Sequence, residues 1–236
     1  MLKAVFFDLD GTLLPLDEEK FTKLYFGLMC QRMAPFGYNP EELINVIWSG
    51  TKKMYLNDGT KTNEEVFWDE FVKFYGVDKL QDKNIIDEFY KEEFRKTKEG
   101  CEENPYVLDI IKCCHDLNLL TILSTNPIFP KEGTKTRMSF IGLKESDFDF
   151  ITTYENSCFC KPNPKYFEML LKKFNLKSDE VIVFGNNTYE DGECAYSVGI
   201  KCYMVGNYII NHPKTIHEFE HVKMSDVVNV IKSYLK

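Results

Sequence analysis

Two carboxylates lie two residues apart near the start of the chain, in the run Asp8-Leu9-Asp10-Gly11-Thr12. The residues Lys3 to Leu9 are mostly apolar and rich in β-formers, so they predict a buried strand that ends at a glycine turn. Two carboxylates this close disfavour joint ionisation unless a cation lies between them, so one can act as a nucleophile while the other holds or passes a proton. A divalent metal ion would favour that division of roles. The alternative is an ordinary Asp-Gly turn after a strand, because both residue types are common in turns.

Three later segments carry polar groups that would complete such a site. A hydroxyl and an amide follow the second predicted core strand at Ser124-Thr125-Asn126, and Lys161 comes just before a helix that Asn163 caps. The fourth predicted core strand ends at Gly185-Asn186-Asn187, and Asp191 follows in the same segment. A hydroxyl, a lysine and oxygen ligands around a carboxylate nucleophile suit phosphoryl transfer, in which charge on the phosphoryl oxygens must be offset. Acyl transfer would require a different set of catalytic groups.

The elements that must position these residues alternate between strands and helices. Strands are expected at residues 3–9, 119–124, 149–154, 180–185 and 200–205, with helical patterns between them. Such alternation is typical of parallel βαβ units, and ligands bind at the carboxyl ends of the strands in open parallel sheets. The predicted fold class is therefore α/β, a Rossmann-like parallel sheet core with helices on both faces.

The alternation is interrupted from about Leu16 to Gly100, where four helical patterns replace the strands. This segment is interpreted as a helical bundle inserted after the first strand. The predicted domains are a core of residues 1–15 and 101–236 and an α-helical cap of residues 16–100. Aromatic residues of the insert, including Trp48, Trp68 and Phe71, are expected in its core, although they could also line a ligand pocket.

With these residues in this order, the sequence resembles the haloacid dehalogenase-like hydrolase superfamily over essentially its whole length. The run from Asp8 to Thr12, together with Thr125, Lys161 and Asp191, is similar to the four motifs of that family, and the insert is similar to its C1 cap. The resemblance implies that Asp8 attacks phosphorus to form an aspartyl-phosphate. It also implies that Asp10 protonates the leaving alcohol and then activates water.

The same resemblance implies which residues bind the phosphate and the metal. Thr125, Asn126 and Lys161 would bind phosphate, with Lys161 balancing the charge on phosphate and nucleophile. Mg²⁺ would be held by the Asp8 carboxylate, the Asp10 backbone carbonyl and the fourth motif, here Asn187 and Asp191. Members in which the second Asp of the first motif is replaced include the true dehalogenases, so the presence of Asp10 favours a phosphatase.

The fourth motif departs from the family pattern, which usually has two acids four positions apart. Asn187 stands in the first place and Asp191 in the second. An amide oxygen can coordinate magnesium, but it removes one negative charge from the shell of a hard cation. At ~4 Å and an effective dielectric of ~20 a unit charge pair is worth roughly 4 kcal/mol, so a weaker metal site is expected. Replacing Asn187 by Asp is expected to lower the magnesium concentration that gives half-maximal activity.

The composition argues against several other partners. The chain has 37 Asp and Glu against 29 Lys and Arg, a net charge of −8, which speaks against nucleic acid. No uncharged apolar run approaches the ~18 residues of a membrane span, and the N-terminus lacks the features of a signal peptide, so a cytoplasmic protein without a membrane partner is expected. The eight cysteines contain no C-x-x-C pair and are expected to be free thiols. A monomer or weak homodimer is expected.

Three features outside the motifs have simpler interpretations. The segment His217 to His221 matches the zinc-protease pattern H-E-x-x-H, but no third ligand follows in the expected position, so it is interpreted as a surface segment. Arg137 is expected to be solvated at a helix start, with binding of a substrate anion as the alternative. Cys160 adjoins Lys161, so oxidation of its thiol is expected to impair activity.

The predicted function is magnesium-dependent hydrolysis of a small phosphorylated metabolite, a phosphate monoester. One alternative is a phosphomutase of the same fold, which must protect its aspartyl-phosphate from water. The other is a metabolite-binding or regulatory protein that Asn187 has weakened as a catalyst. The cap is expected to close over the site and select the substrate, with Pro15 and residues 99–105 as hinges.

Overall fold

The computed structural model describes residues 1–235. The strands are β1 (Ala4–Phe7), β2 (Leu120–Leu123), β3 (Phe150–Ile151), β4 (Val181–Gly185), β5 (Lys201–Val205) and β6 (Glu220–Val222). The α-helices are α1 (Glu18–Met33), α2 (Pro40–Tyr55), α3 (Asn63–Tyr75), α4 (Lys83–Lys91), α5 (Val107–Asp116), α6 (Lys131–Ser139), α7 (Lys165–Phe174), α8 (Cys194–Ser197) and α9 (Val227–Ser233). A π-helical turn covers Thr188–Glu193, and the longer 3₁₀ segments are Val77–Asp82 and Glu93–Gly100.

The strands form one parallel sheet in the order β3-β2-β1-β4-β5-β6. This is the strand order of a Rossmann-like fold, in which the sheet order reverses beside the first strand. The α/β fold class predicted from the alternating pattern is confirmed, and β1 to β5 lie within the predicted strand segments. The strand β6 was not predicted, and it overlaps the segment 217–221 that resembled a zinc-binding pattern. The carboxyl ends of β1 and β4 lie next to each other, where ligands bind in such sheets.

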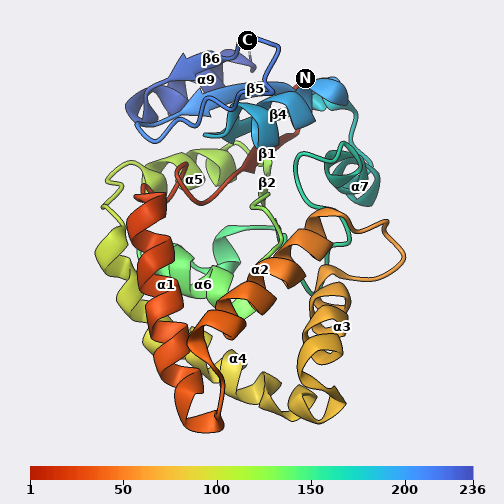
Figure 1. Cartoon of the computed structure of the whole chain (residues 1–236). Helices are drawn as coiled ribbons and strands as arrows, with labels where there is room; N and C mark the ends of the chain where they lie inside the picture. Colours follow the sequence, from red (N-terminus) through yellow and green to blue (C-terminus); the bar gives the residue numbers. More distant parts are fainter. Residues whose placement is uncertain (236) are drawn as a thin grey trace.

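Alternate residues of β1 point to opposite faces of the sheet, as the period of a strand requires. Val5 and Phe7 pack in the cluster that includes the buried faces of α5 and α9, whereas Ala4 and Phe6 pack in the cluster of α7 and α8. Figure 1 shows α5 and α7 on either side of the strands. Because helices cover both faces, β1 is buried at every position, and its carboxyl end is held rigidly.

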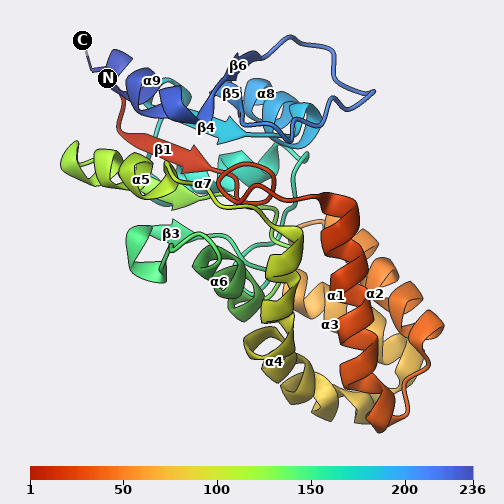
Figure 2. The same cartoon turned by 90° about the vertical axis from the view of Figure 1, so that its left-hand side faces the viewer.

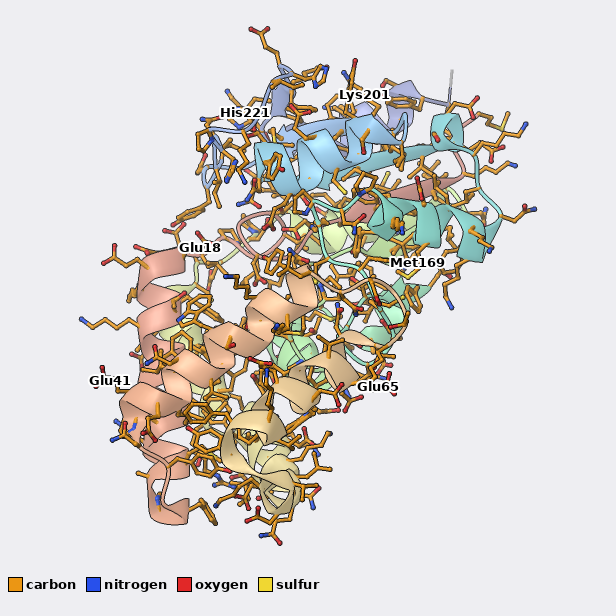
Figure 3. All side chains as sticks on the ribbon, turned by 45° about the vertical axis from the view of Figure 1, so that its right-hand side comes forward. Glu18, Glu41, Glu65, Met169, Lys201 and His221 are labelled. Atoms are coloured by element: carbon orange, nitrogen blue, oxygen red, sulfur yellow. The ribbon has the colours of Figure 1, made fainter. Side chains whose placement is uncertain are left out.

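The helices α1 to α4 lie between β1 and α5 in the chain, and they gather beyond the carboxyl ends of the strands, away from both termini (Figures 1 and 2). Each of the first three begins at a capping side chain: Asp17, Asn39 and Thr62 accept hydrogen bonds from backbone N–H groups of the first turn. The charged residues Glu41 and Glu65 are exposed on the outside of this bundle (Figure 3). The division at residues 15/16 and 100/101 stays a prediction.

The two chain segments that join the bundle to the sheet run antiparallel and pair with each other. The Asp17 N–H donates to the Gly100 carbonyl at 3.1 Å, and the Glu102 N–H donates to the Pro15 carbonyl at 2.8 Å. Leu16 and Cys101 form an antiparallel bridge between these bonds. The segments proposed as hinges are therefore held together by main-chain hydrogen bonds. In the described part of the chain no helix is both long enough and apolar enough to cross a membrane.

Candidate active site

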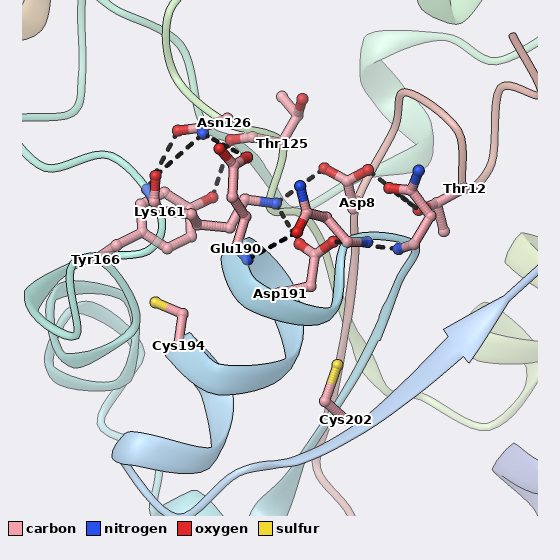
Figure 4. Close-up of polar contacts among 12 residues, drawn as sticks. Asp8, Thr12, Thr125, Asn126, Lys161, Tyr166, Glu190, Asp191, Cys194 and Cys202 are labelled. Atoms are coloured by element: carbon pink, nitrogen blue, oxygen red, sulfur yellow. Dashed lines mark hydrogen bonds and ion pairs between the residues drawn. The ribbon is translucent and has the colours of Figure 1, made fainter. Parts of the chain in front are cut away.

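Three strand ends and one loop bring the predicted residues together. Asp8 follows β1, Thr125 follows β2, Asp191 lies in the turn after β4, and Lys161 lies in the loop before α7 (Figure 4). The Lys161 ammonium donates to Asp8 Oδ1 at 2.9 Å and to Asp191 Oδ1 at 2.5 Å. Asp8, Lys161 and Asp191 are all buried. The structure thus places one cation between the proposed nucleophile and the acid of the fourth motif.

The turn after β1 explains why a glycine follows the second carboxylate. Gly11 has a φ of +78°, in the left-handed region, and a Cβ there would overlap the side-chain amide of Asn186. The turn is closed by hydrogen bonds from the Gly11 and Leu14 N–H groups, each at 2.8 Å, to the carbonyls of Leu14 and Leu9. It directs the Thr12 hydroxyl to Asp8 Oδ2 at 3.1 Å. Both carboxylate oxygens of Asp8 are therefore oriented.

A second glycine shapes the segment after β4. A Cβ on Gly185 would overlap the carboxyl group of Asp191, so glycine is what allows that side chain to fold back over the strand end. Asp191 Oδ2 accepts hydrogen bonds from the N–H groups of Asn186 at 3.1 Å and Asn187 at 3.0 Å. The acid is held at the site by backbone donors on one oxygen and by Lys161 on the other.

The electrostatics of the cluster follow from its burial. Burial raises the pKa of Asp8 to about 7; the Lys161 ammonium opposes this shift, while Asp191 and Asp10 reinforce it. Burial alone would lower the pKa of Lys161, but its ion pairs with Asp191 and Asp8 outweigh burial and hold that pKa well above the usual range. The lysine therefore stays cationic beside the nucleophile.

Asp10 is held by Arg137, a residue expected from the sequence to lie in solvent. That expectation was wrong: the Arg137 side chain is 1% exposed, forms an ion pair with Asp10 Oδ2, and lies over the Phe129 ring with its guanidinium carbon 4.1 Å from the centroid. The other oxygen, Asp10 Oδ1, is buried with no hydrogen-bond partner among the described residues. One oxygen of this acid is thus anchored, and the other is left for a ligand or a proton.

Arg137 lies three residues after Thr134 and four after Gly133, and in the structure all three occupy one buried face of α6. A glycine and a threonine do not mark such a face in the sequence. An arginine on the buried face of a helix needs a partner, and the carboxylates of the first motif are obvious candidates.

The side-chain oxygen of Asn187 already accepts hydrogen bonds within the protein. That oxygen accepts hydrogen bonds from the N–H groups of Tyr189 at 3.0 Å and Glu190 at 3.1 Å, so Asn187 caps the π-helical turn. The neighbouring Asn186 instead reaches the turn after β1, where its Oδ1 accepts from the Thr12 hydroxyl at 3.4 Å. This geometry favours Asn186 over the predicted Asn187 as the amide of the metal site. Two adjacent asparagines cannot be told apart by spacing alone.

A hydrogen-bond network that residue spacing does not reveal joins the helical bundle to the site. Tyr55, the last residue of α2, donates to Glu190 Oε1 at 3.1 Å, and Asn126 Nδ2 donates to Glu190 Oε2 at 2.9 Å. Asn126 also contacts the backbone of Lys161, donating to its carbonyl and accepting from its N–H, both at 3.2 Å. Burial raises the pKa of Glu190, the carboxylate that accepts the hydrogen bonds from Tyr55 and Asn126. Asn126, predicted to bind phosphate, thus also holds Lys161 in place.

Thr125 presents a free hydroxyl. It is buried, lines the cavity next to Asp8, and its Oγ1 has no hydrogen-bond partner within residues 1–235. Its carbonyl, by contrast, accepts from Thr152 at 2.6 Å and Tyr166 at 3.0 Å, which fixes the backbone. A rigid backbone with an open hydroxyl suits the binding of a phosphoryl oxygen.

The oxygen donors at the site fit a magnesium ion. They comprise the carboxylates of Asp8 and Asp191, the main-chain carbonyl of Asp10 and the amide of Asn186, all hard ligands of the kind that this ion prefers. No cluster of three or more His, Cys, Asp or Glu side chains in the described chain could hold a metal ion, so the set depends on amide and backbone oxygens and on water. Four acids, counting Glu190, face two cations, which leaves net negative charge for a divalent cation.

A cavity of about 290 Å³ opens onto these residues from the helical bundle. Aromatic side chains supply much of its wall, and Trp48 and Trp68 are among them. Trp68 and Phe71 are buried as expected of core residues, but Trp48 is 52% exposed. The aromatic residues therefore serve both of the roles considered from the sequence.

Two other motifs do not contribute to this site. His217 pairs with Glu193 at 2.8 Å and His221 contacts the Gly206 carbonyl at 2.8 Å, so the two histidines of the zinc-protease pattern have separate partners. Cys160 is 1% exposed and burial raises the pKa of its thiol, which argues against the oxidation sensitivity expected from its position. All eight cysteines are free thiols.

Comparisons with known proteins agree with this fold. A family model described as haloacid dehalogenase-like hydrolase matches residues 5–205. Among solved structures, the chain is similar to a HAD phosphatase from Thermococcus onnurineus, with 19% identity, a TM-score of 0.62 and 98% of each chain covered. It is also similar to CbbY from Rhodobacter sphaeroides, solved in complex with phosphate (15% identity, TM-score 0.57, 94% of each chain covered). A 2-haloacid dehalogenase from Pseudomonas syringae pv. Tomato DC3000 matches with 17% identity and a TM-score of 0.61, over 99% of this chain and 100% of that one. No curated protein sequence matches the chain significantly.

Proposed function

The chain belongs to the haloacid dehalogenase-like hydrolase family, and we propose that it is a magnesium-dependent phosphatase that hydrolyses a small phosphate monoester. The observation that carries the proposal is the pair of carboxylates after β1. Asp8 is oriented by Lys161 and Thr12, and Asp10 is oriented by Arg137. This is the division into nucleophile and proton carrier that phosphoryl transfer through an enzyme carboxylate requires.

In the proposed first step, a carboxylate oxygen of Asp8 attacks phosphorus as the bond between phosphorus and the alcohol oxygen breaks. Asp10 gives a proton from Oδ1, the oxygen that Arg137 does not hold, to that alcohol oxygen, so the product leaves as a neutral alcohol and the phosphoryl group stays on Asp8. Lys161 offsets the negative charge on nucleophile and phosphate, and the Thr125 hydroxyl donates to a phosphoryl oxygen. A bound magnesium ion would supply further charge neutralisation at the phosphoryl oxygens.

In the second step, water attacks the phosphorus of the aspartyl-phosphate and the bond to Asp8 breaks. Asp10 accepts the proton of the attacking water, so both carboxylates return to their starting states with release of inorganic phosphate. Arg137 acts as a positioning residue, because it contacts Asp10 and holds one of its oxygens in place. Asp8, the Asp10 carbonyl, Asn186 and Asp191 are proposed to hold the magnesium.

The Asp10–Arg137 pair favours phosphate ester hydrolysis over dehalogenation. The similarities to a phosphatase and to a dehalogenase have nearly equal TM-scores, so they show the shared fold and do not separate the two reactions. Loss of a halide ion requires no proton from the enzyme, whereas loss of an alkoxide does. An acid anchored by a buried arginine is therefore expected for an ester substrate. We further propose a cytoplasmic monomer or weak homodimer that acts on a phosphorylated metabolite.

Phosphate release from a panel of phosphate monoesters, measured with and without magnesium, tests this proposal. We expect magnesium-dependent turnover that Asp8→Asn abolishes. A phosphomutase would instead require a bisphosphate activator and would return an isomerised phosphate ester. A binding protein would bind a ligand tightly without turnover under any divalent metal, and that result would overturn the proposal.

A further inference from the structure

The cavity between the helical bundle and the sheet has two chemically different ends. One end holds Asp8, Thr125 and Lys161, where the phosphate is proposed to bind. The rest of the wall is mostly apolar, with rings contributed from all four helices of the bundle and from the loop before α6. Among these rings are those of Phe21, Tyr25, Trp48, Trp68, Tyr90 and Phe129. The organic part of a bound monoester would contact this apolar part.

Polar atoms of the wall are largely paired with each other. The hydroxyls of Tyr25 and Tyr90 lie 2.9 Å apart in a hydrogen bond, and the Trp68 indole N–H donates to the Tyr154 hydroxyl at 3.5 Å. Tyr25 and Tyr90 are also buried. Breaking such pairs to reach a substrate hydroxyl would leave a buried polar group unsatisfied, which costs ~1–3 kcal/mol each. These residues therefore offer a substrate ring faces and few hydrogen bonds.

The part of the cavity wall that α2 forms also has few hydrogen-bond donors without a partner. Thr51 donates to the Ile47 carbonyl at 2.9 Å, and Tyr55 donates to Glu190 at 3.1 Å. Within residues 1–235, the cap wall retains three donors without a protein partner: the Thr22 hydroxyl, the Trp48 indole N–H, and whichever O–H of the Tyr25–Tyr90 pair does not donate within that pair. Three donors spread over separate helices cannot satisfy the several hydroxyls of a sugar, each of which would lose its hydrogen bonds to water on entry.

The charges around the cavity disfavour a second anionic group. Arg137 and Lys161 are the cations among the lining residues of the described chain, and both are already engaged, with Asp10 and with Asp8 and Asp191. Glu18, at the start of α1, adds a negative charge to the lining. A carboxylate or a second phosphate on the substrate would therefore enter without a cation to receive it.

On the basis of the proposed phosphatase activity, we propose that the preferred substrate is a phosphate monoester of a compact apolar alcohol, aromatic in character and without a second anionic group. The cavity volume of about 290 Å³ lies at the small end of ligand sites, which suits one ring system. Burying ~100 Å² of apolar surface strengthens binding by roughly 50-fold, enough to separate a benzyl from a hydroxyl-rich group.

Steady-state kinetics with three probes test this specificity: benzyl phosphate, a hexose monophosphate and a hexose bisphosphate. We expect kcat/KM for benzyl phosphate to exceed that for the hexose monophosphate by ~50-fold, with the bisphosphate weakest. Equal or better turnover of either sugar phosphate would overturn the inference about the pocket, while Asp8-dependent phosphate release would leave the phosphatase proposal standing.

Binding without turnover provides a separate measurement. Both tryptophans of the chain line the cavity, so their intrinsic fluorescence reports on its occupation. We expect benzylphosphonate, which cannot be hydrolysed, to change this fluorescence at lower concentration than inorganic phosphate does. Binding of benzylphosphonate in a protein that hydrolyses no ester would contradict the phosphatase proposal and support the pocket. If benzylphosphonate changed the fluorescence only at the same concentrations as inorganic phosphate, the apolar pocket would be contradicted.

Substitutions inside and outside the cavity test whether its apolar wall determines the KM for benzyl phosphate. Phe26 is a half-buried lining residue whose ring lies 5.4 Å from that of Trp48, and Phe26→Ala is expected to raise KM for benzyl phosphate about tenfold. Trp48→Ala, at a 52% exposed position, provides a second variant that disturbs folding less. Phe74→Ala removes an exposed ring of α3 that does not line the cavity and is expected to change nothing. An equal KM increase in all three variants would overturn the assignment.

Discussion

Arg137 carries the charge that orients the proposed acid–base residue, although it lies far from Asp10 in the chain. Its guanidinium pairs with Asp10 Oδ2, stacks on Phe129 and is fully enclosed. A buried arginine with a single carboxylate partner is costly unless the partner stays in place, so the two side chains hold each other. The consequence is an Asp10 carboxyl with one fixed oxygen and one available oxygen.

Replacing Arg137 by lysine is expected to lower kcat by about 10²-fold through loss of positioned proton transfer. Since a good leaving group needs little protonation, the loss is expected to be smaller for nitrophenyl phosphate than for an alkyl phosphate. Steady-state kinetics on the two substrates measure this difference. Arg95→Lys, at an exposed position, is the matched control. An equal loss on both substrates would reduce Arg137 to a structural role.

The two adjacent asparagines after β4 lead to a prediction that differs from the sequence-based one. Asn186→Asp is expected to lower the magnesium concentration for half-maximal activity by about tenfold, because it adds a charge worth up to ~4 kcal/mol that Lys161 partly offsets. Asn187→Asp is the matched control, since an aspartate oxygen can cap the π-helical turn as well as the asparagine oxygen does. Measuring the activity of both variants as a function of magnesium concentration distinguishes the two assignments. A response of Asn187→Asp alone would restore the original assignment.

Most residues of the site could be predicted from the sequence because each lies in the segment that follows a recognisable strand. Asp8, Thr125 and Asp191 are of this kind. Arg137 and Tyr55 could not be assigned, because their roles depend on contacts between elements that no local pattern encodes. The side-chain direction of Asn187 depends on a π-helical turn, whose hydrogen bonds are likewise invisible to residue spacing.

At the scale of elements, the contact between α2 and the turn after β4 links cap and site. Tyr55 ends α2 and donates to Glu190, which Asn126 also holds. Because Asn126 contacts the backbone of Lys161, the position of α2 is coupled to the position of the lysine. The helical bundle is therefore attached to the end of the cavity where phosphate is proposed to bind, as well as through its two linking segments.

Removing the Tyr55 hydroxyl is expected to cost about 1–2 kcal/mol of unfolding free energy, since a hydrogen bond to a largely buried carboxylate is lost. Urea denaturation of Tyr55→Phe measures this value. Tyr106→Phe, which removes an exposed hydroxyl without a hydrogen bond in the described chain, is expected to change stability by less than ~0.5 kcal/mol. Equal stabilities of the two variants would show that the Tyr55 contact does not hold the cap.

The strands were largely predictable from the sequence, and β6 is an exception with a physical reason. The strands β1, β2, β4 and β5 are short apolar runs bounded by turns, which is the pattern of a strand buried on both faces. The edge strand β6 is three residues long, and two of them are exposed. A charged edge strand of this length carries no hydrophobic period, and its pairing depends on β5 alone.

At the scale of the molecule, the sheet supplies the proposed catalytic residues and the helical bundle supplies most of the wall of the cavity beside them. The strand order places the ends of β1 and β4 side by side, and α1 to α4 cover that edge (Figures 1 and 2). The net charge of −8 is spread over a surface that includes residues such as Glu41 and Glu65, while the acids at the site are only partly balanced by the two buried cations. The sequence indicated that the bundle was inserted, but the apolar cavity arises only from how its helices pack against the sheet.

The central claim is that Asp8 becomes phosphorylated during turnover. Acid quenching of the enzyme during steady-state hydrolysis, followed by peptide mass spectrometry, tests it most directly, with Asp10→Asn used to slow the hydrolysis of the intermediate. We predict one phosphoryl group on the peptide that contains Asp8, in the presence of magnesium and substrate, and none in Asp8→Asn. Undiminished phosphate release by Asp8→Asn, or a phosphoryl group on a different residue, would contradict the mechanism.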